Sequence, residues 1–133
     1  MRYVIDTNVA IAMLAQQQPV LERLSSLAPE DLGLSVVVIA ELLFGARLSA
    51  RTRDNVARVQ ALEARFPTLP VTRPIVERYG IVRADLASRG LAKGDFDLLI
   101  ACTALEEGAT LVTNDAALKD GSIPRLVVED WLS

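Results

Sequence analysis

The sequence predicts an α/β fold in which helices cover both faces of a parallel sheet of four to five short strands. Short apolar segments alternate with longer helical patterns along the whole chain. These apolar segments are continuous, as in strands that are buried on both faces. Hydrophobic residues make up 51% of the 133 residues, which is enough to form a packed core. Because the chain shows no linker and no repeat, we expect one domain over residues 1–133.

The expected elements follow one another with short connections. Strands are expected at Tyr3–Ile5, Leu32–Leu34, Leu69–Val71, Thr110–Val112 and Arg125–Val128. Helices are expected from Asn8 to Leu14, after Pro19, from Val36 to Leu48, from Thr52 to Phe66, from Thr72 to Ser88, from Asp95 to Glu107 and around Asn114 to Leu118. Helix N-caps are predicted at Asn8, Ser35, Thr72 and Asp95. Gly90 and Gly108 are placed to end two of these helices.

The composition excludes several classes of chemistry. The chain has no histidine, which removes Ser/His/Asp and Cys/His catalysis. Cys102 is its one cysteine, so neither an internal disulfide nor a Cys-rich zinc site can form. No apolar run approaches the length of a membrane span, and the opening Met1-Arg2-Tyr3 leads into a strand rather than a signal peptide. We therefore expect a cytoplasmic protein that works with carboxylates, hydroxyls, arginines or a bound metal.

Charge is distributed unevenly along the chain. The net charge is −3, but residues 44–93 carry ten basic and four acidic residues. Twelve of the 14 basic residues are arginines, whose forked guanidinium suits phosphate contacts. The arginines from Arg47 to Arg65 predict either a solvated helix face or a surface that holds phosphate groups.

Four carboxylates interrupt apolar segments or follow strands: Asp6, Glu41, Asp97 and Asp115. Each also has a purely structural explanation, because Asp6 can cap a helix, Asp97 can complement a helix dipole and Asp115 can form a turn. Glu41 is harder to explain in this way, since no Lys or Arg lies within five residues of it.

Taken together, the four acids predict a metal site. Ligands of open α/β sheets collect at the carboxyl ends of the strands, where several of these acids are expected. Neighbouring carboxylates cannot all ionise without a counter-charge. Mg²⁺ or Mn²⁺ supplies that charge and prefers oxygen ligands, which are the ligands that this composition offers.

The motifs around these acids resemble those of the PIN domain family, and in particular its small VapC-type ribonuclease toxins. The resemblance extends over essentially the whole chain. It is carried by four segments in order: Val4-Ile5-Asp6-Thr7-Asn8, Glu41 within an apolar helix, Asp97-Leu98-Leu99-Ile100-Ala101 and Leu111-Val112-Thr113-Asn114-Asp115.

This resemblance implies a three-layer α/β/α fold and a Mg²⁺- or Mn²⁺-dependent endoribonuclease that cleaves RNA with water activated by the metal. Asp6, Glu41, Asp97 and Asp115 would be its metal-binding and catalytic acids, with Asp6 and Asp97 as the nearest ligands. Asn8 and Thr113 would orient carboxylates, and Asp95 would be a helix cap with a possible supporting role. Arg47, Arg51 and Arg53 would hold the RNA backbone.

The same resemblance implies two protein partners. One is an antitoxin whose C-terminal segment places an arginine at the acids and its apolar face on helices near Leu21, Leu24 and Leu27 or near Leu42, Leu43 and Leu48. The other is a second copy of the chain, since a mean hydropathy of +0.31 is high for a small protein.

Three other functions remain as alternatives. A PIN-like fold could be a binding module without catalysis. An aspartyl phosphotransferase would need an acid two residues after Asp6, where the chain has Asn8. A response-regulator-like phosphoacceptor would need a lysine at a later strand end, and neither Lys93 nor Lys119 follows an expected strand.

Overall fold

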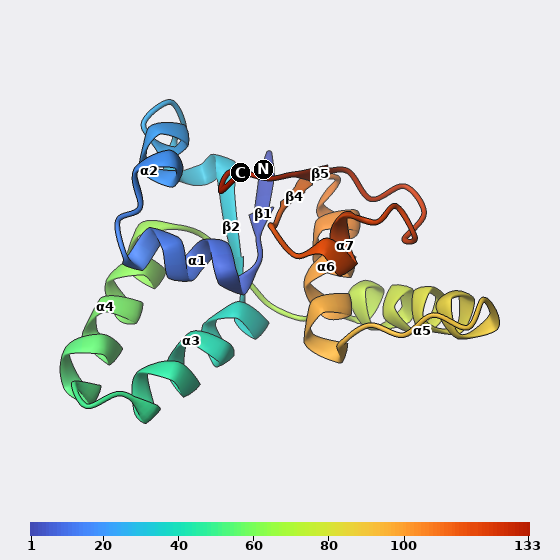
Figure 1. The fold of residues 1–133 in the computed structure, drawn as a ribbon, viewed down its shortest axis with the longest axis horizontal. Helices are drawn as coiled ribbons and strands as arrows, with labels where there is room; N and C mark the ends of the chain where they lie inside the picture. The colour runs from blue at the N-terminus through green and yellow to red at the C-terminus, as the bar shows by residue number, and fades with distance from the viewer.

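Five parallel strands form the centre of the computed structural model, which describes residues 1–133 (Figure 1). Their order across the sheet is β3-β2-β1-β4-β5, so that β1 lies in the middle. The strands are β1 (Tyr3–Ile5), β2 (Leu32–Ser35), β3 (Thr68–Leu69), β4 (Thr110–Val112) and β5 (Val128–Glu129). The predicted α/β class with a parallel sheet is confirmed.

Helices lie on both sides of this sheet (Figure 1). The α1–α4 helices lie on one side, and α5 and α6 lie on the other. The helices are α1 (Thr7–Leu14), α2 (Gln18–Leu24), α3 (Val36–Leu48), α4 (Thr52–Arg65), α5 (Arg73–Ser88), α6 (Asp95–Glu107) and α7 (Ala116–Lys119). None of them is both long and apolar enough to cross a membrane.

The central strand determines which residues meet at the carboxyl edge of the sheet. β1 pairs with β4 in parallel, with Ile5 opposite Val112. The residues that follow these two, Asp6 and Thr113, therefore leave the sheet side by side. The backbone N–H of Asp6 continues the ladder by donating to the carbonyl of Val112 at 3.0 Å. Two segments that lie more than 100 residues apart in sequence are thus joined at one point.

The long helix α3 begins where β2 ends. Ser35 is buried, and its hydroxyl accepts a hydrogen bond from the N–H of Val37 at 3.1 Å, as expected of an N-cap. The inward face of α3 is apolar and packs on the core. Since α3 starts at the carboxyl edge of the sheet, its middle residue Glu41 is held close to that edge.

Several element boundaries differ from the prediction. The N-cap of α1 is Asp6 rather than Asn8, because the Asp6 carboxylate reaches the N–H of Val9. The N-cap of α6 is Gly94 rather than Asp95. The short α7 begins after Asp115 rather than around Asn114.

The last strand, expected at residues 125–128, is instead Val128–Glu129. Arg125 has a positive φ of 66°, so it cannot lie in an extended strand. The strand at β3 is likewise shorter than the predicted Leu69–Val71 and starts one residue earlier.

The core also contains residues that the sequence suggested as a docking face. Leu24 of α2 and Leu42 of α3 are buried in the main hydrophobic cluster, and Leu21, Leu27 and Leu43 are half-buried against it. The periodic apolar face of α2 packs on the rest of the protein and is not free for a partner. Of the residues named for this role, Leu48 alone is exposed.

Candidate active site

Asp6 is the innermost acid of the site, with 4% of its surface exposed. Its Oδ1 accepts the hydrogen bond from Val9 at 3.1 Å, and its Oδ2 accepts one from the hydroxyl of Thr113. Burial raises the pKa of Asp6, and the nearby charge of Asp115 adds to that increase, while these hydrogen bonds oppose it. Asp6 is therefore both a helix cap and a carboxylate that is costly to ionise.

Asp115 is connected to the same hydroxyl. Its backbone N–H donates to the Thr113 Oγ1 at 3.0 Å, and its Oδ1 accepts from the N–H of Ala117 at 2.9 Å as the N-cap of α7. Thr113 is fully buried between the two acids and fixes their relative position. The second oxygen of Asp115 has no hydrogen-bond partner in the chain.

Glu41 reaches the site from α3 and is half-buried. Its Oε1 accepts a hydrogen bond of 2.5 Å from the hydroxyl of Thr7, the first residue of α1. No basic side chain pairs with Glu41. This agrees with the sequence, in which no Lys or Arg lies within five residues of Glu41. Thr7 was not among the predicted site residues, although its place directly after Asp6 could have indicated it.

Asp97 lies in the first turn of α6 and makes no hydrogen bond or ion pair with the chain. Burial raises its pKa most, and the charges of Asp115, Glu41 and Asp6 raise it further. The four predicted acids therefore gather around Asp97, and Asp115 lies near Asp6 as well. They line one cavity of about 530 Å³, together with Thr7, Asn8, Ile11, Ala40, Phe44 and Phe96.

Lys93 partly offsets this repulsion, because its charge lowers the pKa of Asp97. Its own side chain is only 4% exposed, and its Nζ lies 2.9 Å from Asp120 and also contacts the carbonyl of Ala117. Lys93 thus ties the loop before α6 to α7 and remains outside the cavity lining. No pattern in the sequence predicted this role for Lys93, which follows no strand.

Two of the predicted supporting residues have other partners. Asn8 lines the cavity, but its amide donates to Asn114 at 3.4 Å rather than to a carboxylate. Asp95 points toward α5, where it accepts a hydrogen bond from Tyr79 at 2.7 Å and lies 2.8 Å from Arg83. Asp95 therefore joins α5 to α6 and is not part of the cavity lining.

The arginines fall into two groups. Those of α5 are neutralised: Arg73, Arg78, Arg83 and Arg89 each pair with a carboxylate. The exposed Arg47, Arg51 and Arg53, where α3 meets α4, pair with none. Arg58 and Arg65 of α4 pair with no carboxylate either, so the basic block keeps unpaired arginines along α4 as well as at the α3–α4 end.

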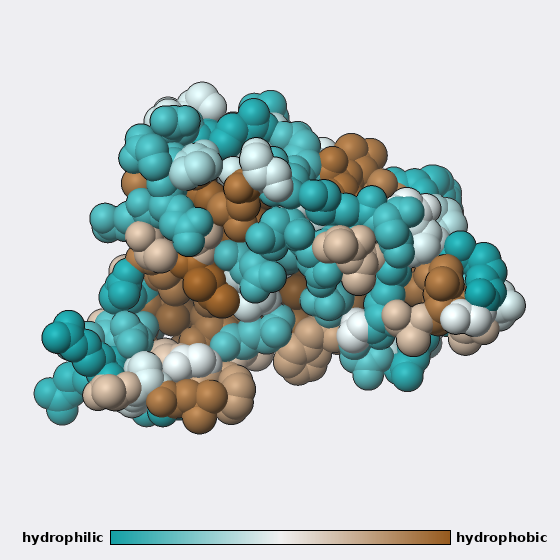
Figure 2. Space-filling view, viewed as in Figure 1, coloured by the Kyte–Doolittle hydropathy of each residue, from teal (hydrophilic) through white to brown (hydrophobic).

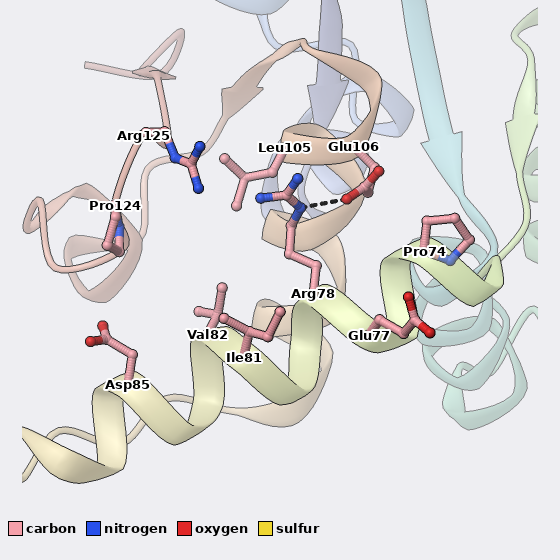
Figure 3. A pocket seen from close by; sticks show the side chains of 10 residues that line it. All are labelled: Pro74, Glu77, Arg78, Ile81, Val82, Asp85, Leu105, Glu106, Pro124 and Arg125. Carbon is pink, nitrogen blue, oxygen red and sulfur yellow. Dashed lines mark hydrogen bonds and ion pairs between the residues drawn. The ribbon is translucent and has the colours of Figure 1, made fainter.

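A second depression, of about 490 Å³, lies between α5, the end of α6 and the loop before β5 (Figure 3). Its Glu106 pairs with Arg78 at 2.6 Å, and its Asp85 pairs with Arg89 at 2.6 Å. With these acids already neutralised, it has no group of unpaired carboxylates that would require a cation. The four predicted catalytic acids all line the acidic cavity instead.

A family model of the PIN domain matches residues 3–122. The chain belongs to the PIN domain family. The resemblance that its motifs predicted is confirmed, and the acidic cavity is formed entirely by residues inside the matched region.

Relatives and solved structures agree with this assignment. The chain is 33% identical to "Ribonuclease VapC2" of Rickettsia felis and 28% identical to "tRNA(fMet)-specific endonuclease VapC" of Salmonella typhimurium, over 98% of each chain. It superposes with a TM-score of 0.89 and 32% identity on a chain of the crystal structure of VapBC2 from Rickettsia felis bound to a promoter DNA fragment, covering 98% of this chain and 99% of that chain. VapBC-1 from nontypeable Haemophilus influenzae gives a TM-score of 0.88 at 32% identity, with both chains fully covered.

The mutual repulsion of the acids predicts that removing one charge stabilises the metal-free protein. Because the pKa of Asp97 is raised in the folded state, ionised Asp97 destabilises the fold at pH 7. This penalty disappears as the pH falls through the raised pKa and below the ordinary value of 3.8. Asp97→Asn should therefore raise the melting temperature at pH 7 in EDTA, and its advantage should vanish in acid.

The control for this measurement is Asp54→Asn, which removes an exposed acid of α4 outside the cavity and should leave the melting temperature within about a degree of wild type. A lower melting temperature for Asp97→Asn than for wild type at pH 7 would show that the four acids do not repel one another in the folded protein.

Proposed function

We propose that this chain is a metal-dependent endoribonuclease and the toxin of a type II toxin–antitoxin pair. The observation that carries the proposal is the single cavity in which Asp6, Glu41 and Asp115 all raise the pKa of Asp97. The names of its full-length relatives, which are VapC ribonucleases, and the VapBC complexes among similar structures support the activity and the toxin role. We infer that the protein acts in the cytoplasm, where RNA is found.

The donor set fits Mg²⁺ or Mn²⁺. All available donors are carboxylate and hydroxyl oxygens, which these cations prefer. No three acids lie close enough to enclose an ion by themselves. Mg²⁺ commonly keeps several waters and takes only one or two carboxylates from the protein, so its binding does not require three acids around one point.

We assign the direct contacts to Asp97 and to the free oxygen of Asp115, since neither is occupied by a hydrogen bond. Asp6 and Glu41 already accept hydrogen bonds from Thr113 and Thr7, and they complete the negative environment around the cation. When bound, the cation lowers the pKa of the attacking water and offsets charge that develops on the phosphate. Asp97 and Asp115 would hold the cation in the acidic cavity, with Asp6 and Glu41 beside it.

The unpaired arginines at the α3–α4 end are suited to hold the RNA backbone. Arg47 lies six residues beyond Glu41 on α3, which places it about 9 Å farther along the helix axis. Contacts of this kind position a nucleic acid without reading its sequence. They also explain how a protein with a net charge of −3 attracts a polyanion.

Purified protein should cleave RNA with Mg²⁺ or Mn²⁺ and stop when EDTA is added. Asp97→Asn should lower the cleavage rate by at least about 100-fold, because it removes a carboxylate that holds the cation. Asp95→Asn, two residues earlier and outside the cavity, is the matched control and should retain most of the activity. Cleavage that survives EDTA, or a binding of RNA without cleavage under every metal condition, would favour the alternative of a non-catalytic binding module.

The antitoxin is assigned to a groove beside the acids. The groove lies between α1, α3 and α4 and has a volume of about 270 Å³. Figure 2 shows hydrophobic side chains in this part of the surface. Its apolar lining consists of Ile11, Leu14, Leu42, Ala46 and Val59, and it shares Ile11 and Glu41 with the acidic cavity. An amphipathic segment of the antitoxin can therefore lie in the groove while an arginine reaches the acids.

An arginine bound at the acids must compete with the metal cation. Inhibition of RNA cleavage by a peptide from the antitoxin's C-terminal segment should therefore weaken as Mg²⁺ is raised. Added monovalent salt should weaken it less, because the apolar contacts in the groove are not screened. An inhibition constant that does not change with Mg²⁺ would place the peptide away from the carboxylates.

A second copy of the chain is the other proposed partner. Large apolar side chains remain exposed away from the cavity as well, including Val76 and Ile81 on α5 and Val127 before β5. The high mean hydropathy of +0.31 agrees with such surfaces being covered in solution. Light scattering at micromolar concentration should give twice the chain mass of 14.4 kDa, and the mass of one chain would contradict a dimer.

A further inference from the structure

Lys93 has the least exposed side chain of the seven bases that form ion pairs in the chain. It is 4% exposed, whereas the other six basic side chains are 30% to 81% exposed. Burying an ammonium group is costly unless its hydrogen bonds are satisfied. Here the Nζ lies 2.9 Å from a carboxylate oxygen of Asp120 and also donates to the carbonyl of Ala117. An ion pair of the surface needs no such burial, so the place of Lys93 requires an explanation of its own.

The partners of Lys93 belong to the helix that orients Asp115. The N–H of Ala117 donates to the Oδ1 of Asp115 at 2.9 Å, and the carbonyl of the same residue accepts from Lys93. Asp120 is the C-cap of α7, so both partners lie toward the C-terminal end of this four-residue helix, where a positive charge is favourable. Moving the ammonium group would therefore move the residue that holds the Asp115 carboxylate.

The backbone of Lys93 leads directly to the other acid that has free oxygens. The next residue, Gly94, is the N-cap of α6, and its carbonyl accepts from the N–H of Leu98 at 3.0 Å. The carboxylate of Asp97 lies against this glycine, since a β-carbon at Gly94 would come within 3.4 Å of the Asp97 Oδ2. Lys93 thus connects the segments that carry Asp97 and Asp115, the two acids assigned above to direct contact with the cation.

The anchor of Lys93 is itself held in place. Asp120 accepts hydrogen bonds from the N–H of Ser122 at 2.9 Å and from its hydroxyl at 2.6 Å. These bonds and the one from Lys93 lower the pKa of Asp120, so the pair is ionised at neutral pH. Arg89, which ends α5, donates to the carbonyl of Ser122 at 2.5 Å. The loop before α6 is therefore joined to the segment after α7 at two points.

We propose that Lys93 is a positioning residue of the metal centre, which joins the segment of Asp97 to that of Asp115 and so sets the separation of their carboxylates. The proposal rests on the metal-dependent activity proposed above and adds a residue outside the cavity lining. Charge and position predict opposite effects here. The charge of Lys93 acts on Asp97 and would repel a cation bound there, so removing the charge alone would tighten metal binding. Loss of a group that orients the ligands weakens it.

The test is the dissociation constant of Mn²⁺, measured by calorimetry on metal-free protein that is folded at the temperature of the titration. Lys93→Met keeps most of the apolar stem and removes the ammonium group, and it should raise the constant by about 10-fold or more. Lys119→Met is the matched control, because it removes a lysine of α7 that pairs with Asp130 instead, and it should leave the constant unchanged.

The double variant Lys93→Met/Asp120→Asn removes the ion pair without changing the net charge. Charge alone predicts an unchanged constant for it, whereas positioning predicts the same weakening as in Lys93→Met, because both substitutions break one connection. If Lys93→Met does not fold, Asp120→Asn and the double variant decide. In RNA cleavage, the Mn²⁺ concentration for half-maximal rate should rise by the same factor as the dissociation constant, while the rate at saturating Mn²⁺ returns toward that of wild type.

Equal or tighter Mn²⁺ binding by Lys93→Met and the double variant would overturn the proposal, and tighter binding by Lys93→Met alone would show that the lysine acts only as a counter-charge. Wild-type protein that binds Mn²⁺ with a constant that these variants leave unchanged disproves the positioning role alone. Wild-type protein that binds no Mn²⁺ disproves the proposed function.

Discussion

Repulsion among four carboxylates in one cavity is the constraint on which the rest of the structure depends. Burial and three neighbouring acids raise the pKa of Asp97, and Lys93 partly offsets this effect. A fold that holds such a group together without a counter-charge is less stable than it could be. The hydrogen bonds from Thr7 to Glu41 and from Thr113 to Asp6 reduce the cost but leave the net charge unchanged. In the proposed function, a divalent cation held by these acids would remove this cost and supply the chemistry for cleaving a phosphodiester.

The parallel sheet is what brings these acids together. The register of β1 on β4 sets Asp6 beside Thr113, and Thr113 in turn holds Asp115 through its backbone N–H. Two of the four acids also have a structural task, since Asp6 caps α1 and Asp115 caps α7. Capping fixes one oxygen of each of these two carboxylates and thereby orients the other oxygen. The same residue can therefore cap a helix and face the cavity.

Most of the fold could be predicted because it depends on local patterns. The apolar run at β1 and the cap at Ser35 are visible in the sequence and are found in the structure. The contact of Thr7 with Glu41 spans 34 positions and depends on how α1 packs against α3, so no local pattern reveals it. The role of Lys93 was missed for the same reason.

Two errors have equally physical causes. Asp95 and Asp97 both suit the first turn of a helix, and only the packing of α5 against α6 shows that Asp95 faces Arg83. Leu24 has the periodicity of an amphipathic face, but periodicity does not tell whether that face meets the core or a partner. It meets the core. The pairs of Arg73 with Glu77 and of Arg89 with Asp85 have a spacing of four residues that is visible in the sequence, whereas the partners of Arg78 and Arg83 lie on α6 and depend on how α5 packs against it.

The most direct test of the account is a calorimetric titration of the metal-free protein with Mn²⁺ in buffers of different ionisation enthalpy. Carboxylates whose pKa is raised by mutual repulsion release protons when a cation binds near them. If the four acids form a metal centre, Mn²⁺ binds saturably and releases protons in mildly acidic buffer. The binding and the proton release should both be strongly reduced in Asp97→Asn and unchanged in Asp95→Asn. Binding that is the same in wild type and Asp97→Asn, or no binding at all, would contradict the claim that these four acids form a metal centre.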